Sequence, residues 1–364
     1  MMSTRRRIGP PALLGIPALI AFSAMAFWLY SQPPGIGSDD AYFFSRGLTR
    51  FSLTDFSPHF PGYPAFIGLG RVLGLAIPDP VAALQAMTVT LALALPIAAA
   101  WVALRWGCPV SIVLAVFLLT LSQPLLPLLA LSGLSDGGGL LFFLLFLACL
   151  GARPTARAGP AFLAGLFLGL AAATRPSYAP LLFAAYCVVL LGAPRPAIVV
   201  AIGSACVAVP AALVLYANEG PALFDEAQRF VTGHTLSWGN TAFARPDAAP
   251  RWTHTIRDTW WPGPLLVLYG LAALRAIVLW RTLFLAQRLC VVVFLVSAAW
   301  TWAMQNPENL RHLAPTLLLG PLPLVSGPRG SAVVVGVWAA LVVNVAALLT
   351  GVSITPRDAP LAGC

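Results

Sequence analysis

Apolar runs of roughly 20 residues recur along this chain, from about residue 11 to residue 350. Such a run has the length that an α-helix needs to cross a bilayer, whereas the strands of an outer-membrane barrel would alternate apolar with polar residues. Hydrophobic residues make up 59% of the sequence and charged residues 9%, while about a quarter of a soluble domain is charged. We therefore expect an all-α, polytopic membrane protein, folded as a single domain over residues 1–364.

The apolar segments predict about eleven membrane spans. They cover residues 11–30, 81–104, 109–131, 137–151, 160–174, 177–192, 196–216, 263–280, 284–304, 313–326 and 331–350. The first could instead be a signal peptide, because three arginines precede it and Ala24-Met25-Ala26 fits a cleavage motif. Its length is nearer a full span than the core of a signal peptide, which favours an uncleaved helix with a cytoplasmic N-terminus.

The positions of the charges support this topology. With eleven spans, the cytoplasmic side receives 11 arginines and no acid, and the opposite side receives the other 10 arginines, all 12 acids and all four histidines. An acid at mid-bilayer costs about 2.5–3.5 kcal/mol on insertion scales, and a wrong number of spans would mix the two sides. The net charge of +9 comes from arginine alone, so the positive-inside rule accounts for it without a nucleic-acid partner. The functional face is therefore predicted to be extracytoplasmic.

Two long loops lie on that predicted face, at residues 32–80 and 217–262. The first contains two adjacent carboxylates, Asp39 and Asp40, in a chain with 12 acids among 364 residues. After them, the aromatic residues of 42–51 fall on one helical face and the arginines on another, which suits a short helix in the membrane interface. A second short apolar helix is expected over 65–77. The tryptophans of the second loop favour an interfacial belt over a sugar-binding platform.

Four segments together resemble the GT-C glycosyltransferases. The acidic pair, the aromatic-rich helix and the sequence Pro-Gly-Tyr-Pro at 61–64 look like the first external loop of that superfamily. The segment 131–136 opens a helix from the external side, 165–176 resembles a Gly-Leu-rich helix that ends in Thr-Arg-Pro, and 309–315 resembles an Arg-Tyr-Leu-Leu-Pro-like segment. The resemblance covers about residues 10–325 in order and is nearest to the bacterial protein-mannosyltransferase-like members.

The resemblance implies a reaction and a location. Members of the superfamily take a sugar from a polyprenyl-phosphate carrier in the bilayer and transfer it to an acceptor outside the cytoplasm. For this chain it implies a multi-pass protein of the bacterial inner (plasma) membrane. The acceptor would be an extracytoplasmic glycan, lipid or protein.

The chemistry of such a transfer can be assigned to particular residues. Displacing a lipid phosphate from an anomeric carbon needs a base near the acceptor hydroxyl and positive charge near the leaving phosphate. Asp39 or Asp40 is the candidate base, and the pair could also hold Mg²⁺ or Mn²⁺ through carboxylate oxygens. Arg175 and Arg311 are candidates for the phosphate, because a guanidinium binds phosphate oxygens through a bidentate fork and stays charged. One base and one displacement predict inversion at the anomeric carbon.

The acidic candidates also have a structural interpretation, because Ser and Asp favour helix N-caps. Ser38, Asp39 and Asp40 could cap the helix that follows them, although capping accounts for one acid better than for two. Asp136, a further substrate-binding candidate, could cap its own helix. The glycines at 137–139 instead allow a ligand or another backbone to approach closely.

The basic candidates have structural interpretations as well. Arg175 could extend toward the membrane interface, since long basic side chains keep the charged end in water. Arg311 could form a surface ion pair with Glu308, three residues away. His59, the last substrate-binding candidate, could be a polar residue of the interface.

Two other functions remain open at this point. A polymerase or ligase of lipid-linked glycans would also place basic residues outside, but it would use a pyrophosphate-linked donor. A lipid or glycolipid transporter predicts ionisable residues along a pathway within the spans, whereas no acid of this chain lies in the middle of a predicted span. The sequence favours the glycosyltransferase over both.

Overall fold

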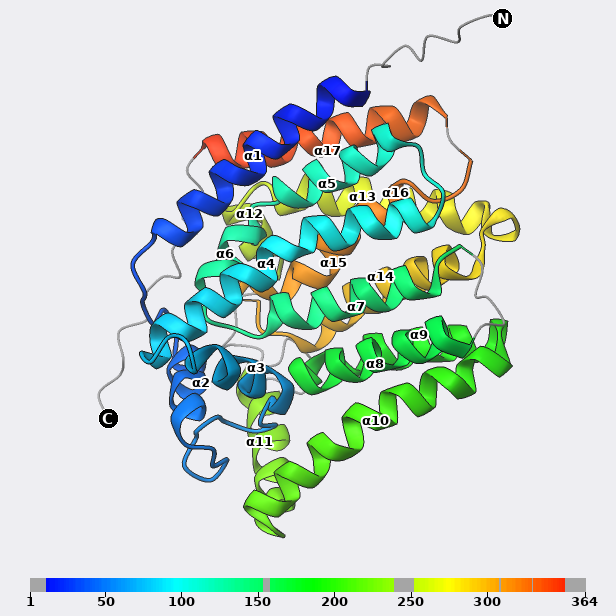
Figure 1. Cartoon of the computed structure of the whole chain (residues 1–364). Helices are drawn as coiled ribbons and strands as arrows, with labels where there is room; N and C mark the ends of the chain where they lie inside the picture. The colour runs from blue at the N-terminus through cyan, green and yellow to red at the C-terminus, as the bar shows by residue number, and fades with distance from the viewer. Residues whose placement is uncertain (1–10, 153–157, 239–251, 308, 329, 351–364) are drawn as a thin grey trace, which may run out of the picture.

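The protein is built from helices throughout the part of the chain that the computed structural model describes, residues 11–152, 158–238, 252–307, 309–328 and 330–350. No strand occurs among these residues, so the all-α prediction is confirmed. The longer helices run side by side, and the short α2 and α3 lie with α11 at one end of the molecule (Figure 1).

The helices have the following bounds. The α-helices are α1 (Pro11–Ser31), α2 (Asp39–Thr49), α3 (Pro64–Gly74), α4 (Pro80–Arg105), α5 (Val110–Leu121), α6 (Leu125–Leu131), α7 (Asp136–Leu150), α8 (Ala158–Thr174), α9 (Ala179–Gly192), α10 (Pro194–Glu219), α11 (Ala222–Trp238), α12 (Trp252–Asp258), α13 (Pro262–Val278), α14 (Leu285–Met304), α15 (Ala314–Leu319), α16 (Pro321–Leu324) and α17 (Ser331–Leu349). The 3₁₀ helices are η1 (Pro176–Tyr178), η2 (Trp280–Thr282) and η3 (Leu310–Leu313).

The predicted apolar segments form helices, but the number of eleven spans is not confirmed. Four described helices, α4, α10, α14 and α17, are long and apolar enough to cross a bilayer, and there are up to seven candidates if each of three bent pairs counts as one span. The segment 109–131 divides into α5 and α6, bent by 58°. Others are short: α7 has 15 residues, fewer than the roughly 20 of a straight span. The apolar helices are compatible with a membrane protein.

Glycines bring α8 and α10 into close contact. A Cβ atom on Gly165 would lie 2.2 Å from the carbonyl oxygen of Val200, and one on Gly203 would lie 2.4 Å from the carbonyl oxygen of Phe162. Two helix backbones can approach this closely only where the side chains between them are absent or very small. This contact positions the C-terminal end of α8, which Arg175 follows directly.

The break between α5 and α6 is stabilised by a polar side chain from α17. Pro124 lacks an N–H group and cannot continue the hydrogen-bond ladder. The Asn344 side-chain amide donates to the carbonyl oxygen of Leu119 at 3.0 Å and to the hydroxyl of Ser122 at 3.3 Å. Asn344 is fully buried. Its side-chain amide supplies a hydrogen-bond donor to the carbonyl of Leu119, which the break leaves without a backbone partner.

The first long loop folds into α2 and α3, so its two predicted short helices are confirmed as helices. The Ser38 hydroxyl accepts from the backbone N–H of Ala41 at 3.2 Å and caps α2. The aromatic residues do not all share one face, however. Phe44 is fully buried whereas Tyr42 is 44% exposed. The reason is that α2 packs on α3 and α4 through the narrow side that contains Phe44.

Candidate functional site

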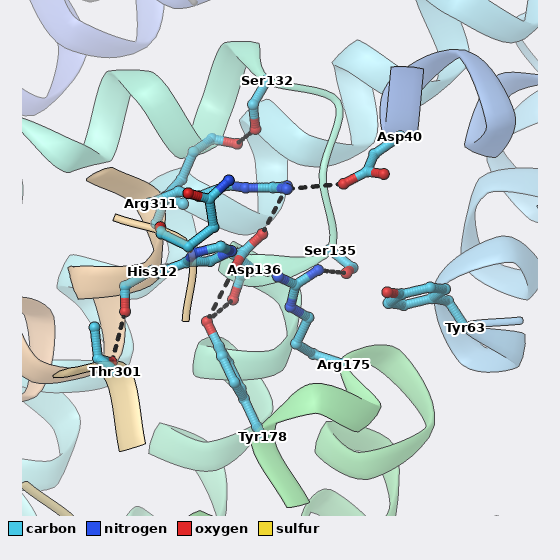
Figure 2. Close-up of polar contacts among 12 residues, drawn as sticks. Asp40, Tyr63, Ser132, Ser135, Asp136, Arg175, Tyr178, Thr301, Arg311 and His312 are labelled. Carbon is cyan, nitrogen blue, oxygen red and sulfur yellow. Dashed lines mark hydrogen bonds and ion pairs between the residues drawn. The ribbon is translucent and has the colours of Figure 1, made fainter. Parts of the chain in front are cut away.

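Four charged side chains from distant parts of the sequence meet near the first loop, and we call them the charged cluster. They are Asp40 at the start of α2, Asp136 at the start of α7, Arg175 between α8 and η1, and Arg311 in η3. Figure 2 shows Arg311 between the two carboxylates and Arg175 below them. The sequence singled out all four residues, and the structure brings them together.

Asp136 and Arg175 form the buried half of the charged cluster. The nearest atoms, Nη2 of Arg175 and Oδ1 of Asp136, are 3.0 Å apart, and the two side chains are 6% and 1% exposed. Arg175 also donates to the hydroxyl of Ser135 at 3.2 Å, and the Tyr178 hydroxyl donates to Asp136 at 3.4 Å. The capping interpretation of Asp136 and the interfacial interpretation of Arg175 are therefore both wrong. Ser135 occupies the N-cap position, and Arg175 faces inward.

Arg311 connects the buried half to the surface. Its Nη2 atom donates to Oδ2 of Asp40 at 2.8 Å, and its Nη1 atom lies 3.7 Å from Oδ2 of Asp136. The predicted alternative, an ion pair with Glu308, falls on a residue that lies outside the described part of the chain. The Nε and Nη1 atoms of Arg311 and the Nε atom of Arg175 are buried and have no hydrogen-bond partner among the described residues. The two guanidinium groups therefore keep N–H donors for a ligand.

Asp40 and Asp39 differ in their surroundings. The side chain of Asp40 is 33% exposed, and that of Asp39 is exposed at the start of α2. Burial raises the pKa of Asp40, but Arg311, His59 and Arg175 together more than offset burial and hold that pKa well below its usual range. No ion pair joins Asp39 to another described side chain. The Ser38 cap frees both acids from a capping role, yet only Asp40 reaches the charged cluster.

His59 and Tyr63 line the edge of the charged cluster on the side of Asp40. The Nε2 atom of His59 lies 3.8 Å from Oδ1 of Asp40 and 3.2 Å from the Tyr63 hydroxyl. The imidazole ring stacks on Phe44 and on Phe230 of α11. Burial raises the pKa of Tyr63 to about 12, so the phenol stays protonated. His59 therefore belongs to the site, and α11 covers it.

Three further residues at the site were not predicted as site residues. Tyr63 lies in the Pro-Gly-Tyr-Pro sequence, Tyr178 follows Arg175 by three positions, and His312 is adjacent to Arg311. Proximity to a predicted arginine was the available signal for the last two. The Nδ1 atom of His312 bonds to the carbonyl oxygen of Asn306 at 3.0 Å. Burial, reinforced by the neighbouring arginines, holds the pKa of His312 well below its usual range, so the ring is neutral.

The carboxylates do not form a complete metal site by themselves. Within the described ranges, no three side chains of His, Cys, Asp or Glu come together as ligands would. Arg311 occupies the Oδ2 atom of Asp40, and Asp39 is exposed beside it. A Mg²⁺ or Mn²⁺ ion would therefore need oxygen ligands from a bound phosphate, as Mg²⁺ often does.

No protein-family model matches this sequence, and neither the curated proteins nor the solved structures contain a match. The geometry of the charged cluster is thus the main guide to its chemistry. It combines a partly exposed carboxylate, a buried carboxylate and two guanidinium groups with unused N–H donors. Such an arrangement can bind an anion and accept a proton from a neighbouring hydroxyl.

Proposed function

We propose that this protein is an integral-membrane glycosyltransferase, which moves a sugar from a polyprenyl-phosphate carrier to an extracytoplasmic glycan, lipid or protein. The observation that carries the proposal is the convergence of Asp40, Asp136, Arg175 and Arg311 from four segments. These are the segments in which the sequence resembles GT-C enzymes. The proposal includes a bacterial inner membrane, about eleven spans counting the short and broken helices, a cytoplasmic N-terminus and an extracytoplasmic site.

The arginines would bind the phosphate of the donor. The Nε atoms of both arginines and the Nη1 atom of Arg311 supply unused donors, and a guanidinium binds phosphate oxygens in a bidentate fork. The bond between the anomeric carbon and the phosphate oxygen breaks, and its electron pair stays on the leaving polyprenyl phosphate. The positive charge of Arg311 and Arg175 stabilises the additional negative charge that develops there.

Asp40 would accept the proton of the acceptor hydroxyl. It is the cluster's more exposed carboxylate, so an acceptor from outside can reach it. The acceptor oxygen forms the new bond to the anomeric carbon from the face opposite the phosphate, which inverts the configuration. Arg311 makes Asp40 a weak base in the free protein. An adjacent cation favours the ionised carboxylate. A phosphate bound to Arg311 would offset the positive charge of the guanidinium and so raise the pKa of Asp40.

The test compares Asp40→Asn with Asp39→Asn, a matched control one residue away. Purified wild type and variants are incubated with polyprenyl-phosphate sugars, and the extracted lipids and products are measured by mass spectrometry. We expect Asp40→Asn to lower the transfer rate by about 10²–10⁴-fold, the usual contribution of a general base, and Asp39→Asn to change it little. Full transfer by both single variants and by the double variant would remove the proposed base.

The same assay separates the other functions. Turnover of pyrophosphate-linked but not phosphate-linked donors would indicate a polymerase or ligase. Movement of labelled lipid across liposomes without covalent change would indicate a transporter. A chelator titration during transfer tests whether Mg²⁺ or Mn²⁺ takes part.

A further inference from the structure

A small pocket adjoins the charged cluster at Asp136 and Arg175 and does not extend to Asp40. Trp300 of α14 and His312 of η3 also line the pocket. The pocket has room for about one water-sized group at most. It is therefore too small for a whole sugar ring but large enough for one hydroxyl group.

One lining residue has a buried polar atom without a hydrogen-bond partner. The Nε1 atom of Trp300 is buried and has no such partner among the described residues. Leaving such a group unpaired is costly, so a native structure normally supplies a partner. Asp136 turns its Oδ1 atom toward Arg175 and Tyr178, which also line the pocket, and its Oδ2 atom toward Arg311. His312 donates through Nδ1 to a carbonyl oxygen, which leaves the lone pair of the neutral ring on Nε2. The walls thus combine at least one N–H donor with a carboxylate and an imidazole acceptor.

We propose that this pocket is a hydroxyl subsite, which receives one hydroxyl group of the transferred sugar; the inference rests on the proposed function. A hydroxyl can donate to Asp136 or His312 and accept from Trp300 at the same time. A phosphate oxygen only accepts, and the Asp136 carboxylate would repel it. The pocket is thereby selective for a neutral polyol group and leaves the phosphate to the unused N–H groups of the arginines.

The depth of the pocket assigns the hydroxyl to the sugar. Asp136 is 1% exposed, whereas the side chain of Asp40 is 33% exposed. An acceptor that arrives from outside meets Asp40 first. The sugar of the donor must lie between Asp40 and the arginine-bound phosphate, and one of its hydroxyls can then reach Asp136.

The test uses a pair of matched variants on α14. Trp300→Phe removes the indole N–H but keeps an aromatic ring, and Trp302→Phe makes the same change at a side chain that is 50% exposed. The probes are farnesyl-phosphate hexoses and pentoses, sugar-free farnesyl phosphate, and monodeoxy analogues of the sugar that binds most tightly. Dissociation constants are measured on the full-length protein in detergent.

We expect Trp300→Phe to weaken binding of the sugar-bearing ligand roughly tenfold, the effect of one buried hydrogen bond. Binding of farnesyl phosphate should be unchanged, and Trp302→Phe should change neither. One deoxy analogue should bind wild type about tenfold more weakly and lose nothing further in Trp300→Phe, because both changes remove the same interaction.

Three outcomes overturn the subsite. If Trp300→Phe leaves sugar binding unchanged, the pocket holds only water. If it weakens farnesyl phosphate equally, the substitution acts through the fold. If every deoxy analogue remains sensitive to Trp300→Phe, no single sugar hydroxyl occupies the pocket. In these cases wild type still binds farnesyl phosphate and the proposed function stands. If wild type binds neither farnesyl phosphate nor any sugar-bearing probe, the result contradicts the proposed donor class and therefore also the hydroxyl subsite.

Discussion

The substitution Arg175→Met tests the buried half of the charged cluster. It removes a guanidinium 3.0 Å from Asp136, whose side chain is 1% exposed, and leaves Arg311 at 3.7 Å as the nearest cation. Removing one partner of a buried ion pair typically costs about 3–5 kcal/mol, because the other charge remains buried without compensation. We expect a loss of this size in the free energy of unfolding.

The measurement is reversible unfolding by SDS titration in mixed micelles. Arg257→Met is the matched control, because Arg257 and Asp258 form an Arg–Asp pair at 3.1 Å whose side chains are 73% and 66% exposed. A surface pair contributes about 0–1 kcal/mol, so the control should lose little. The double variant Arg175→Met/Asp136→Leu should recover much of the loss, since two apolar side chains leave no unpaired charge.

Two results would refute this reasoning. In the first, Arg175→Met is no less stable than Arg257→Met, so that the pair contributes nothing beyond a surface contact. In the second, the double variant loses the sum of the two single losses, so that the two side chains act independently.

Three further predictions concern pH and packing. The folded-state pKa of Asp40 lies below its ordinary value of 3.8, so its stabilising contribution is present above that value and is lost as the pH falls. Asp40→Asn should therefore reduce the dependence of the free energy of unfolding on pH between pH 5 and pH 3. An unchanged pH dependence in the variant would contradict this. Asn344→Leu should cost about 1–3 kcal/mol by leaving the buried carbonyl of Leu119 unpaired, and a loss below 0.5 kcal/mol in the same titration would argue against the polar link. Gly165→Ala should destabilise the packing of α8 on α10 by about 1–3 kcal/mol or more. Gly159→Ala is the control and should be neutral, because its added Cβ would meet nothing within 4 Å. Equal melting temperatures for the two variants would argue against close contact between the helices.

The helices could be predicted from the sequence because their signal is local. Apolar runs predict both ends of α4, α10, α14 and α17 to within three residues. The breaks were harder to predict, because a proline in an apolar run can either bend a helix or end it. Pro96 lies inside the continuous helix α4, whereas Pro124 follows the break after α5. The tertiary contact with Asn344 distinguishes the second case, and it comes from a residue more than 200 positions away.

The members of the charged cluster could be predicted, but their pairing could not. Motif order pointed to Asp40, Asp136, Arg175 and Arg311 as separate candidates. The structural alternative for Arg311 was a pair with a residue three positions away, yet its shortest contact is to Asp40, 271 positions away in the sequence. Spacing along a helix describes only local neighbours. The long-range packing of η3 on α6 and α14 determines the actual partner.

Helix geometry explains why the adjacent acids differ. Successive residues of an α-helix point about 100° apart, so two neighbouring side chains at the start of α2 cannot both face one cluster. Asp40 faces Arg311, and Asp39 is left exposed near the positive end of the helix dipole, where a carboxylate is favoured in any case. The same contact that identifies Asp40 also suppresses its basicity. Under the proposed function, a base that gains strength only when phosphate engages Arg311 would couple proton transfer to donor binding, and Arg311→Lys, which cannot form the bidentate fork, should weaken that coupling.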